Sequence, residues 1–319
     1  MQKKLILPIL NQSITEKYLE DNLSFSKKCV FRLGAEAGFF SEYNNLILFA
    51  LYCYSKNISL LINSEYANFA YKNGWADFFN SILPEHKSVV HCLNVRPYQI
   101  VNHLSYPFLS LYKKVSEIDY FTQDLWKECR RISNKTDLEF SFPHLSFDGN
   151  LIEALHLFNS LLFKPNMNVL DYLRNLKTRT GLPEKYISFH IRQGDKSKEN
   201  ELYGIHKYFE TEFIDPNIKD AFIYTDDLVI IKEIEKKYPE WNLYYDDASL
   251  SGGYNHQNFQ TLKPEIKYQL HIALIANTIL MSESTQFIGT TSSNIGVFVG
   301  ICKKNQNCTF VDHGKWIFW

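Results

Sequence analysis

Short apolar runs alternate with amphipathic stretches along most of this chain, and the alternation predicts a mixed α/β protein. In the C-terminal half the apolar runs are rich in aromatic and β-branched residues, as buried parallel strands are. Between these runs, residues 228–238 and 264–281 carry apolar side chains at helical spacing. Strands separated by helices in this way predict a doubly wound parallel sheet. The expected strands are residues 186–191, 221–225, 242–246, 286–290 and 308–312.

The N-terminal half shows the same alternation less regularly. Residues 41–56 have the spacing of a helix, which Ser41 could cap. This helix would join two strands and so form a βαβ unit. The strands expected in this half are residues 29–34, 59–63 and 88–95.

The domain organisation follows from a change in pattern near the middle of the chain. From about residue 97 to 176 the spacing is mostly helical, most clearly in residues 151–163. Residues 177–185, KTRTGLPEK, are polar and contain glycine and proline, which favours a domain boundary there. We therefore expect an N-terminal α/β domain at 1–180 and a C-terminal Rossmann-like domain at 181–319.

Composition excludes several classes of protein. Of 319 residues, 45% are hydrophobic and 22% are charged, which disfavours intrinsic disorder, and the net charge of −1 offers no basic excess for nucleic acid. The apolar runs are too short to span a bilayer, and Pro8 interrupts an N-terminus that makes a poor signal peptide. The six cysteines form no CxxC pair, so neither a zinc site nor a disulfide framework is expected. A cytoplasmic location fits best.

The strand expected at residues 186–191 runs directly into a polar segment. Open α/β sheets bind their ligands at the carboxyl ends of strands, and two cations at such a place suit a phosphate or diphosphate. Ordinary surface charge after a strand is the alternative. The polar residues at this strand end are His190, Arg192, Asp195 and Lys196.

Two other strand ends carry polar groups. Asp226 and Asp227 precede a helix, where one aspartate is expected to cap the helix while the other could face a ligand. A third strand end continues into Ser292, Ser293 and Asn294. Hydroxyls and backbone N–H groups at the start of a helix bind anions, although a capped helix without a ligand is the alternative.

Three more polar residues could take part in chemistry. Asn277 lies on the apolar stripe of its helix, and a buried amide without partners costs roughly 1–3 kcal/mol. It could bond to neighbouring backbone, or it could contact a ligand. Glu199 and Glu201 lie in a polar segment, and a carboxylate near a sugar nucleotide could act as general base. The chain has neither GxGxxG nor a GxxxxGK[ST] phosphate loop, and the adjacent aspartates lack a third metal ligand.

In their order along the chain, these motifs resemble the fucosyltransferase superfamily, which comprises α1,6-, α1,2- and protein O-fucosyltransferases. Weaker similarity lies in residues 37–45, 74–79 and 251–256. The family's H-x-R-R-x-D element is matched by His190, Arg192 and Asp195, with Lys196 as in the α1,6 type. Its T/S-D-D element is matched by Thr225, Asp226 and Asp227. Its T-x-S-S-Q/N element is matched by Thr290, Ser292, Ser293 and Asn294.

The sequence departs from the family pattern at three positions. The second arginine of the pair is Gln193, and Phe40 replaces a glycine that is usual in the N-terminal turn. Asn277 aligns with the aspartate that reads guanine in the α1,6 enzymes. An amide oxygen accepts a hydrogen bond as a carboxylate does, but it carries no charge.

The resemblance implies a two-domain GT-B enzyme that transfers fucose from GDP-fucose to a glycan hydroxyl, with inversion and without a metal, and the α1,6 type is favoured over α1,2. Arg192 and Lys196 would stabilise the leaving diphosphate, and Glu199, or failing that Glu201, would be the base. No cofactor is implied besides the donor substrate. A lipid-linked acceptor would bring the protein to a membrane surface. The implied catalytic set is Arg192, Glu199, Glu201, Asp195 and Lys196, and the implied donor-binding set is His190, Arg192, Asp226, Asp227, Asn277, Ser292, Ser293 and Asn294.

Two alternatives stay open at this stage. An inverting transferase could use another nucleotide sugar. A catalytically weak protein of the same fold could instead bind a sugar or a nucleotide, since Gln193 and Asn277 depart from the family pattern.

Overall fold

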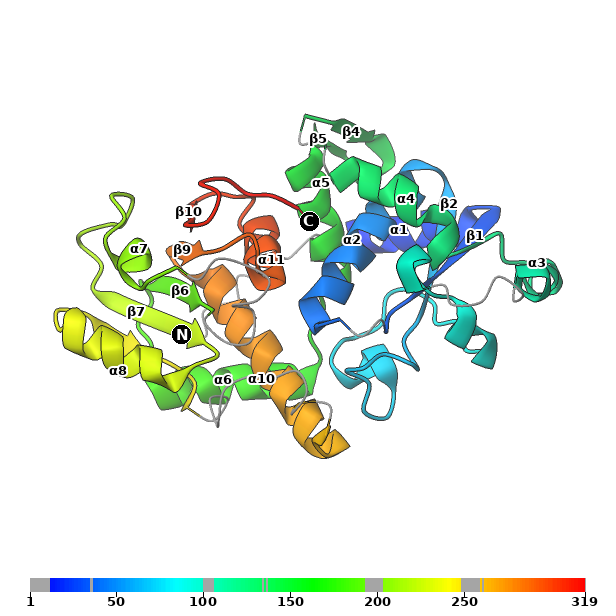
Figure 1. Cartoon of the computed structure of the whole chain (residues 1–319). Coiled ribbons are helices and arrows are strands. Elements are labelled where there is room, and N and C mark those ends of the chain that lie inside the picture. Colours follow the sequence, from blue (N-terminus) through cyan, green and yellow to red (C-terminus); the bar gives the residue numbers. More distant parts are fainter. Residues whose placement is uncertain are drawn as a thin grey trace. The chain divides into compact units, whose positions relative to one another are not determined.

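The computed structural model describes residues 12–34, 37–99, 106–133, 135, 137–192, 203–247, 259 and 261–318. By its internal contacts the chain divides into two compact units, Met1–Asn166 with Trp319, and Met167–Phe318. Each unit holds its own parallel sheet with helices packed against it (Figure 1).

The second unit is built on a five-stranded sheet, in the part of the chain that is described, with the order β10-β9-β6-β7-β8. Every neighbouring pair of strands is parallel, which confirms the sheet expected from the sequence. β8 and β10 end earlier than expected because Asp246 and Asp312 leave the sheet and accept hydrogen bonds from other elements. The strands are β6 (Ile187–Ile191), β7 (Asp220–Thr225), β8 (Asn242–Tyr244), β9 (Gln286–Gly289) and β10 (Cys308–Phe310).

Helices cover both faces of this sheet, as a doubly wound fold requires. Successive side chains of a strand point to opposite faces. Phe189 therefore packs on one face with Ile234 of α8, whereas the hydroxyl of Ser188 donates on the other face to the carbonyl of Met281 in α10 at 3.2 Å. The helices of this unit are α6 (Met167–Thr180), α7 (His206–Phe209), α8 (Leu228–Lys237), α10 (Pro264–Glu283) and α11 (Asn294–Cys302).

Helix α6 packs against α10 and belongs to the second unit by its contacts. The end of α6 is fastened to α10 by an ion pair between Lys177 Nζ and Glu283 Oε2 at 2.6 Å. The polar segment that suggested a boundary at residue 180 therefore includes the last turn of a packed helix. The compact units divide instead after Asn166, so the expected domain limits differ from this division by the length of α6.

The first unit contains the predicted βαβ arrangement, in which β1, α2 and β2 follow one another and the two strands pair in parallel. A short third strand, β3, pairs with the other edge of β1. A separate antiparallel hairpin is formed by β4 and β5. The elements are α1 (Gln12–Ser24), β1 (Lys27–Arg32), α2 (Phe39–Ser55), β2 (Ile58–Asn63), α3 (Tyr106–Val115), β3 (Tyr120–Phe121), α4 (Thr122–Ser133), β4 (Glu139–Phe142), β5 (Phe147–Asn150) and α5 (Leu151–Leu162), with short 3-10 helices at Gly74–Asp77, Val89–Leu93, Pro97–Gln99 and Pro143–Leu145.

Two local predictions for this unit are wrong. Gly38 occupies the N-cap of α2 without a side-chain hydrogen bond, so Ser41 lies inside the helix rather than at its cap. The strand expected at residues 88–95 is the 3-10 helix Val89–Leu93. Its apolar pattern is misleading because Asn94 is buried and joins two other elements, donating to the carbonyl of Val30 at 2.9 Å and accepting from the backbone of α4.

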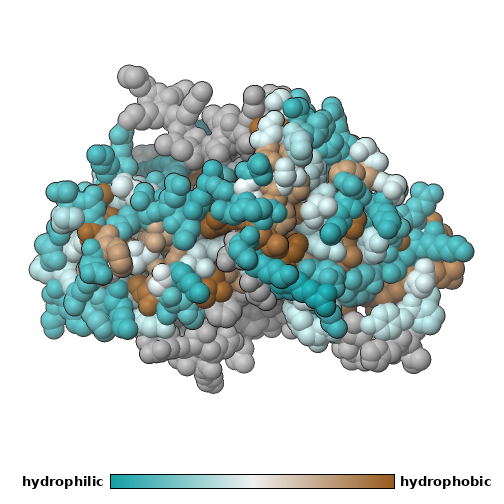
Figure 2. Space-filling view, turned by 90° about the horizontal axis from the view of Figure 1, so that it is seen from above, coloured by the Kyte–Doolittle hydropathy of each residue, from teal (hydrophilic) through white to brown (hydrophobic). Residues whose placement is uncertain are grey.

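Hydrophilic side chains cover most of the face seen in Figure 2, with smaller apolar areas between them. Among the described residues, no helix combines the length and the apolar character needed to cross a membrane.

The core beneath α7 and α8 provides a test of the fold. Phe189 is fully buried, and its ring stacks on Phe209 with centroids 4.3 Å apart. We expect Phe189→Ala to lower the free energy of unfolding of the second unit by about 3–5 kcal/mol, because it removes apolar contacts and leaves a cavity. Urea denaturation followed by tryptophan fluorescence measures this. Val229→Ala, at a side chain that is 65% exposed, is the control, and a loss below about 1 kcal/mol for Phe189→Ala would contradict the packing described.

Candidate functional site

Strand β6 lies in the middle of the sheet of the second unit. From β6 the chain adds β7 and β8 on one side and then crosses to add β9 and β10 on the other. This reversal makes the space between the carboxyl ends of β6 and β9 the topological switch point, where open α/β sheets bind their ligands. His190 and Arg192 at the end of β6, and residues 292–294 after β9, therefore lie where the fold favours a ligand.

Arg192 follows β6 directly and meets Asp226, which follows β7. The Nε of Arg192 lies 4.0 Å from Oδ2 of Asp226, and the two side chains are 27% and 14% exposed. This separation is too long for a hydrogen bond, so the guanidinium is attracted to the carboxylate without being locked against it. The structure thus brings two of the predicted site residues together in a loose pair.

Asp227 has the structural role that was expected for one of the two aspartates. Its Oδ1 accepts a hydrogen bond from the backbone N–H of Val229 at 2.9 Å, which caps α8. Its own N–H donates to the hydroxyl oxygen of Thr225 at 3.2 Å. The cap holds the β7–α8 turn and so positions Asp226 beside Arg192.

His190, at the end of β6, is buried and stacks on Tyr224 with ring centroids 5.8 Å apart. Burial, reinforced by nearby Arg192, lowers the pKa of His190 to about 3, so the ring is neutral at pH 7. Its Nδ1 is enclosed and has no hydrogen-bond partner among the residues described. A buried polar atom of this kind costs free energy unless a partner reaches it.

Asn277, on α10, is also fully buried. Its Nδ2 donates to Oδ2 of Asp246 and to the carbonyl of Ala273, both at 2.8 Å. Its Oδ1 is enclosed without a hydrogen-bond partner in the described part of the chain. The amide that looked out of place in the sequence is therefore satisfied on one side only.

His190 and Asn277 lie at the same level of the unit. Strand β6 and helix α10 run in opposite directions, because α10 leads into β9, which is parallel to β6. Ser188 contacts Met281. From Ser188 to His190 the strand advances about 6.6 Å, and from Met281 back to Asn277 the helix advances about 5.4 Å in the same direction. His190 therefore lies at the same height as Asn277.

The turn after β9 is held by an aspartate that the sequence did not single out. The carboxylate of Asp312 accepts from the backbone N–H groups of Thr291 at 3.1 Å and of Ser292 at 2.7 Å. These two donors are thus already used, and a phosphate would meet the first turn of α11 instead. Ser293 occupies the N-cap of α11 and is buried, but its side chain makes no capping hydrogen bond, so the hydroxyl-capped alternative does not describe this helix.

Close packing explains a glycine in the same helix. A Cβ on Gly296 would lie 1.9 Å from the carbonyl oxygen of Thr290. Only glycine lets the first turn of α11 come this close to the end of β9, where Asn294 begins the helix.

Several predicted residues lie outside the described residues. These are Asp195, Lys196, Glu199 and Glu201, together with Gln193 and the segment 251–256. In the part of the chain that is described, no group of three histidine, cysteine or carboxylate side chains is arranged to hold a metal ion.

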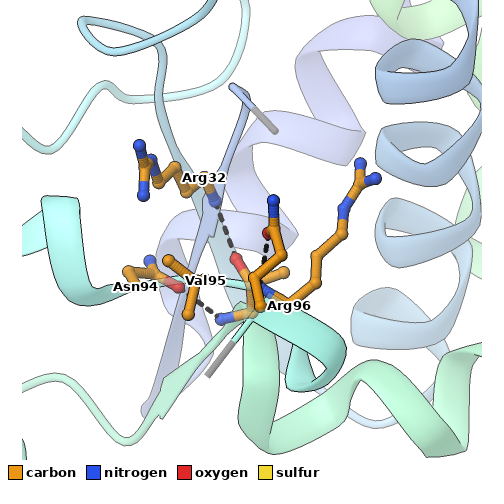
Figure 3. A pocket seen from close by; sticks show the side chains of 6 residues that line it. Arg32, Asn94, Val95 and Arg96 are labelled. Carbon is orange, nitrogen blue, oxygen red and sulfur yellow. Dashed lines mark hydrogen bonds between the residues drawn. The ribbon is translucent and has the colours of Figure 1, made fainter. Parts of the chain in front are cut away.

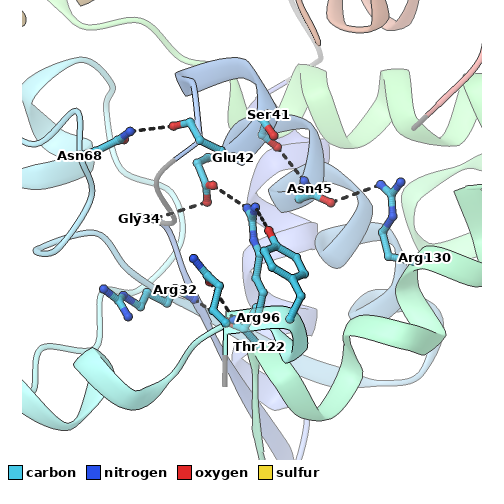
Figure 4. Close-up of polar contacts among 12 residues, drawn as sticks. Arg32, Gly34, Ser41, Glu42, Asn45, Asn68, Arg96, Thr122 and Arg130 are labelled. Atoms are coloured by element: carbon cyan, nitrogen blue, oxygen red, sulfur yellow. Dashed lines mark hydrogen bonds and ion pairs between the residues drawn. The ribbon is translucent and has the colours of Figure 1, made fainter. Parts of the chain in front are cut away.

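The first unit has a second polar cluster, at the carboxyl end of β1. Figure 3 shows the small hollow beside it, lined by Arg32, Arg96 and Thr122 among others. Arg96 donates to Glu42 at 2.6 Å, both side chains are buried, and the other carboxylate oxygen of Glu42 accepts from the N–H of Gly34 (Figure 4). Through Glu42 this pair links Gly34, which follows β1, to helix α2. This ion pair could not be predicted from the sequence, because its two residues are 54 positions apart.

Neither a protein-family model nor a curated protein matches this sequence. The fold is nevertheless similar to that of solved fucosyltransferases. NodZ α1,6-fucosyltransferase soaked with GDP-fucose has 12% identity and a TM-score of 0.54, over 87% of this chain and 92% of its own. A mutant of Arabidopsis thaliana FUT1 in complex with GDP has 10% identity and a TM-score of 0.50, over 92% of this chain and 73% of its own. At these identities the likeness concerns the fold, and at that level it confirms the resemblance predicted from the motifs.

The buried histidine predicts a pH response. The unfolded chain takes up a proton on His190 near pH 6.5, whereas the folded protein does so only near the lowered pKa of about 3. The stability contributed by the neutral ring is therefore fully present above pH 6.5 and is lost as the pH falls toward 3. In NMR titrations we expect the imidazole signal of His190, assigned with His190→Gln, to stay constant from pH 8 down to pH 5. A midpoint near pH 6.5 would show that the ring is not enclosed as described.

Proposed function

We propose that this protein is a glycosyltransferase that transfers fucose from GDP-fucose to a hydroxyl of a glycan or glycoconjugate. The proposal is supported by a fold similar to that of fucosyltransferases and by a polar site at the switch point of the second unit. The observation that carries it is a pair of enclosed polar atoms without partners among the described residues, His190 Nδ1 and Asn277 Oδ1. A planar base would give hydrogen bonds to both atoms, and its diphosphate would meet Arg192.

The charge on the leaving group explains why an arginine is needed. As the glycosidic bond breaks, the nucleoside diphosphate gains negative charge, and a guanidinium can stabilise it where other enzymes use a metal ion. The contact of Arg192 with Asp226 is loose, so the guanidinium can turn toward a phosphate. One such donor contributes roughly 3–4 kcal/mol in the transition state. We therefore propose a metal-independent reaction, in which Lys196 would add a second cation.

Inversion at the sugar carbon requires a single displacement and a base for the acceptor proton. We propose Glu199 for this role, with Glu201 as the second candidate, and Asp195 as a further member of the catalytic set. Ser293 and Asn294 would lie near the phosphates at the start of α11.

The wider architecture belongs to the same proposal. A GT-B enzyme holds its donor in the C-terminal domain and its acceptor in the N-terminal domain, here residues 181–319 and 1–180. We further propose that the enzyme forms a linkage of the α1,6 type and is located in the cytoplasm. A lipid-linked acceptor would bring it to a membrane surface.

A second candidate is an inverting transferase that uses another nucleotide sugar. It is favoured by one observation: an uncharged amide, Asn277, stands where the α1,6 enzymes carry an aspartate.

Nucleotide binding separates the two candidates. We expect GDP to raise the melting temperature of the protein more than UDP or ADP at equal concentration, because a ligand that binds only the folded state stabilises it. Differential scanning fluorimetry measures these shifts. A larger shift with UDP or ADP would select the second candidate, and the absence of a shift with all three would remove the donor site from the account.

The role of Arg192 has its own test. We expect Arg192→Ala to lower the rate of GDP-fucose turnover by about 10²- to 10³-fold, because it removes a donor to the developing charge. Release of GDP with and without acceptor sugars measures the rate. Arg174→Ala is the control, since Arg174 lies on the exposed side of α6 in an ion pair with Asp171. Equal rates for wild type and Arg192→Ala would take Arg192 out of the mechanism.

A further inference from the structure

Asp246, just after β8, is a buried carboxylate that contacts the side chains of Tyr172, Arg179 and Asn277. Its Oδ2 accepts from the hydroxyl of Tyr172 and from Nδ2 of Asn277, each at 2.8 Å. Its Oδ1 forms an ion pair with Arg179, whose side chain is 40% exposed and also lies 3.5 Å from Asp247. With contacts from α6 and α10, the carboxylate has one orientation.

These contacts fix the orientation of the Asn277 side-chain amide. Nδ2 gives its two N–H groups to two acceptors, the carboxylate of Asp246 and the carbonyl of Ala273. Turning the amide over would place Oδ1 against those same two acceptors, with no hydrogen between them. Only Oδ1 is therefore left to face a ligand, and it has no partner among the described residues.

We infer that Asp246 is a positioning residue that makes Asn277 an acceptor-only group and so sets the choice of nucleotide base. The inference rests on the proposed function, since it concerns the same donor site. Asp246 would thus determine base specificity, a role that the sequence did not predict for this residue.

The chemistry of the bases explains the effect. An asparagine with both ends of its amide available pairs with adenine in a bidentate manner, by accepting from N6 and donating to N7. An amide whose Nδ2 is already bound can only accept, as a carboxylate does. Guanine offers adjacent N–H donors at N1 and N2 to such an acceptor, whereas N1 of adenine is itself an acceptor. The Asp246 contact thus allows Asn277 to serve where the α1,6 enzymes carry an aspartate.

Two variants separate this role from simple structural support. In Asp246→Asn, residue 246 can donate as well as accept, so of the two acceptors that hold the Asn277 amide only the carbonyl of Ala273 still requires Nδ2 to face it. In the double variant Asp246→Asn/Asn277→Asp, residue 277 becomes a carboxylate, which only accepts, and the new amide at 246 can donate to it. Both variants lose the ion pair between residue 246 and Arg179, so the difference between them reports on residue 277.

Isothermal titration of GDP and ADP into the full chain measures the preference as a ratio of dissociation constants. We expect Asp246→Asn to lower the preference for GDP by at least about tenfold, and the double variant to restore it to the wild-type value or above. Tyr172→Phe is the matched control. It removes one hydrogen bond to Asp246 but leaves the contact with Asn277, so the preference stays as in the wild type.

The outcomes are distinct. An unchanged preference in Asp246→Asn, or a double variant that does not favour GDP, overturns the inference. Melting temperatures show whether each variant folds; if Asp246→Asn does not, the preference of the double variant decides alone. If the wild-type protein binds neither nucleotide, the proposed function is rejected. If the wild type prefers GDP and Asp246→Asn keeps that preference, only the role of Asp246 is rejected.

Discussion

Parallel pairing of β6 with β7 on one edge and with β9 on the other is the constraint on which the candidate site depends. It places the reversal of strand order beside β6, which is where open α/β sheets bind their ligands. The pairing also fixes the direction of α10, which returns the chain to start β9. Because of this geometry, His190 and Asn277 lie at the same height along β6, although 86 residues separate them in the sequence.

The polar groups around this point are held by partners that leave selected atoms unused. Asp227 caps a helix, Asp312 occupies two backbone donors, and Asp246 holds an amide. At this site two enclosed atoms, Nδ1 of a neutral imidazole and Oδ1 of that amide, have no partner among the described residues, which suits an uncharged planar ligand. The cation at the same strand end is only loosely paired, which suits an anion. Together these groups match the two halves of a nucleoside diphosphate.

The strands could be predicted because each is a short apolar run between helices, and β6 is buried at every position. The cap at Asp227 was also predictable, since it depends on its own helix. Contacts between distant segments were not. The segment around Asn94 has the pattern of a strand, but the Asn94 side chain joins β1 to α4. The role of Asp246 depends on its contacts with α6 and α10. A buried polar residue in an apolar pattern is the signal that could have marked both, but the sequence does not identify the partner.

A crystal structure with GDP bound would show whether the switch point of the second unit holds the nucleotide. We expect the base to lie against His190 and Asn277, with an N–H of the base donating to Asn277 Oδ1 and a second hydrogen bond to His190 Nδ1, and the diphosphate oxygens to lie within hydrogen-bond distance of Arg192. GDP bound elsewhere, or bound with the Arg192 guanidinium turned away from its phosphates, would contradict the account.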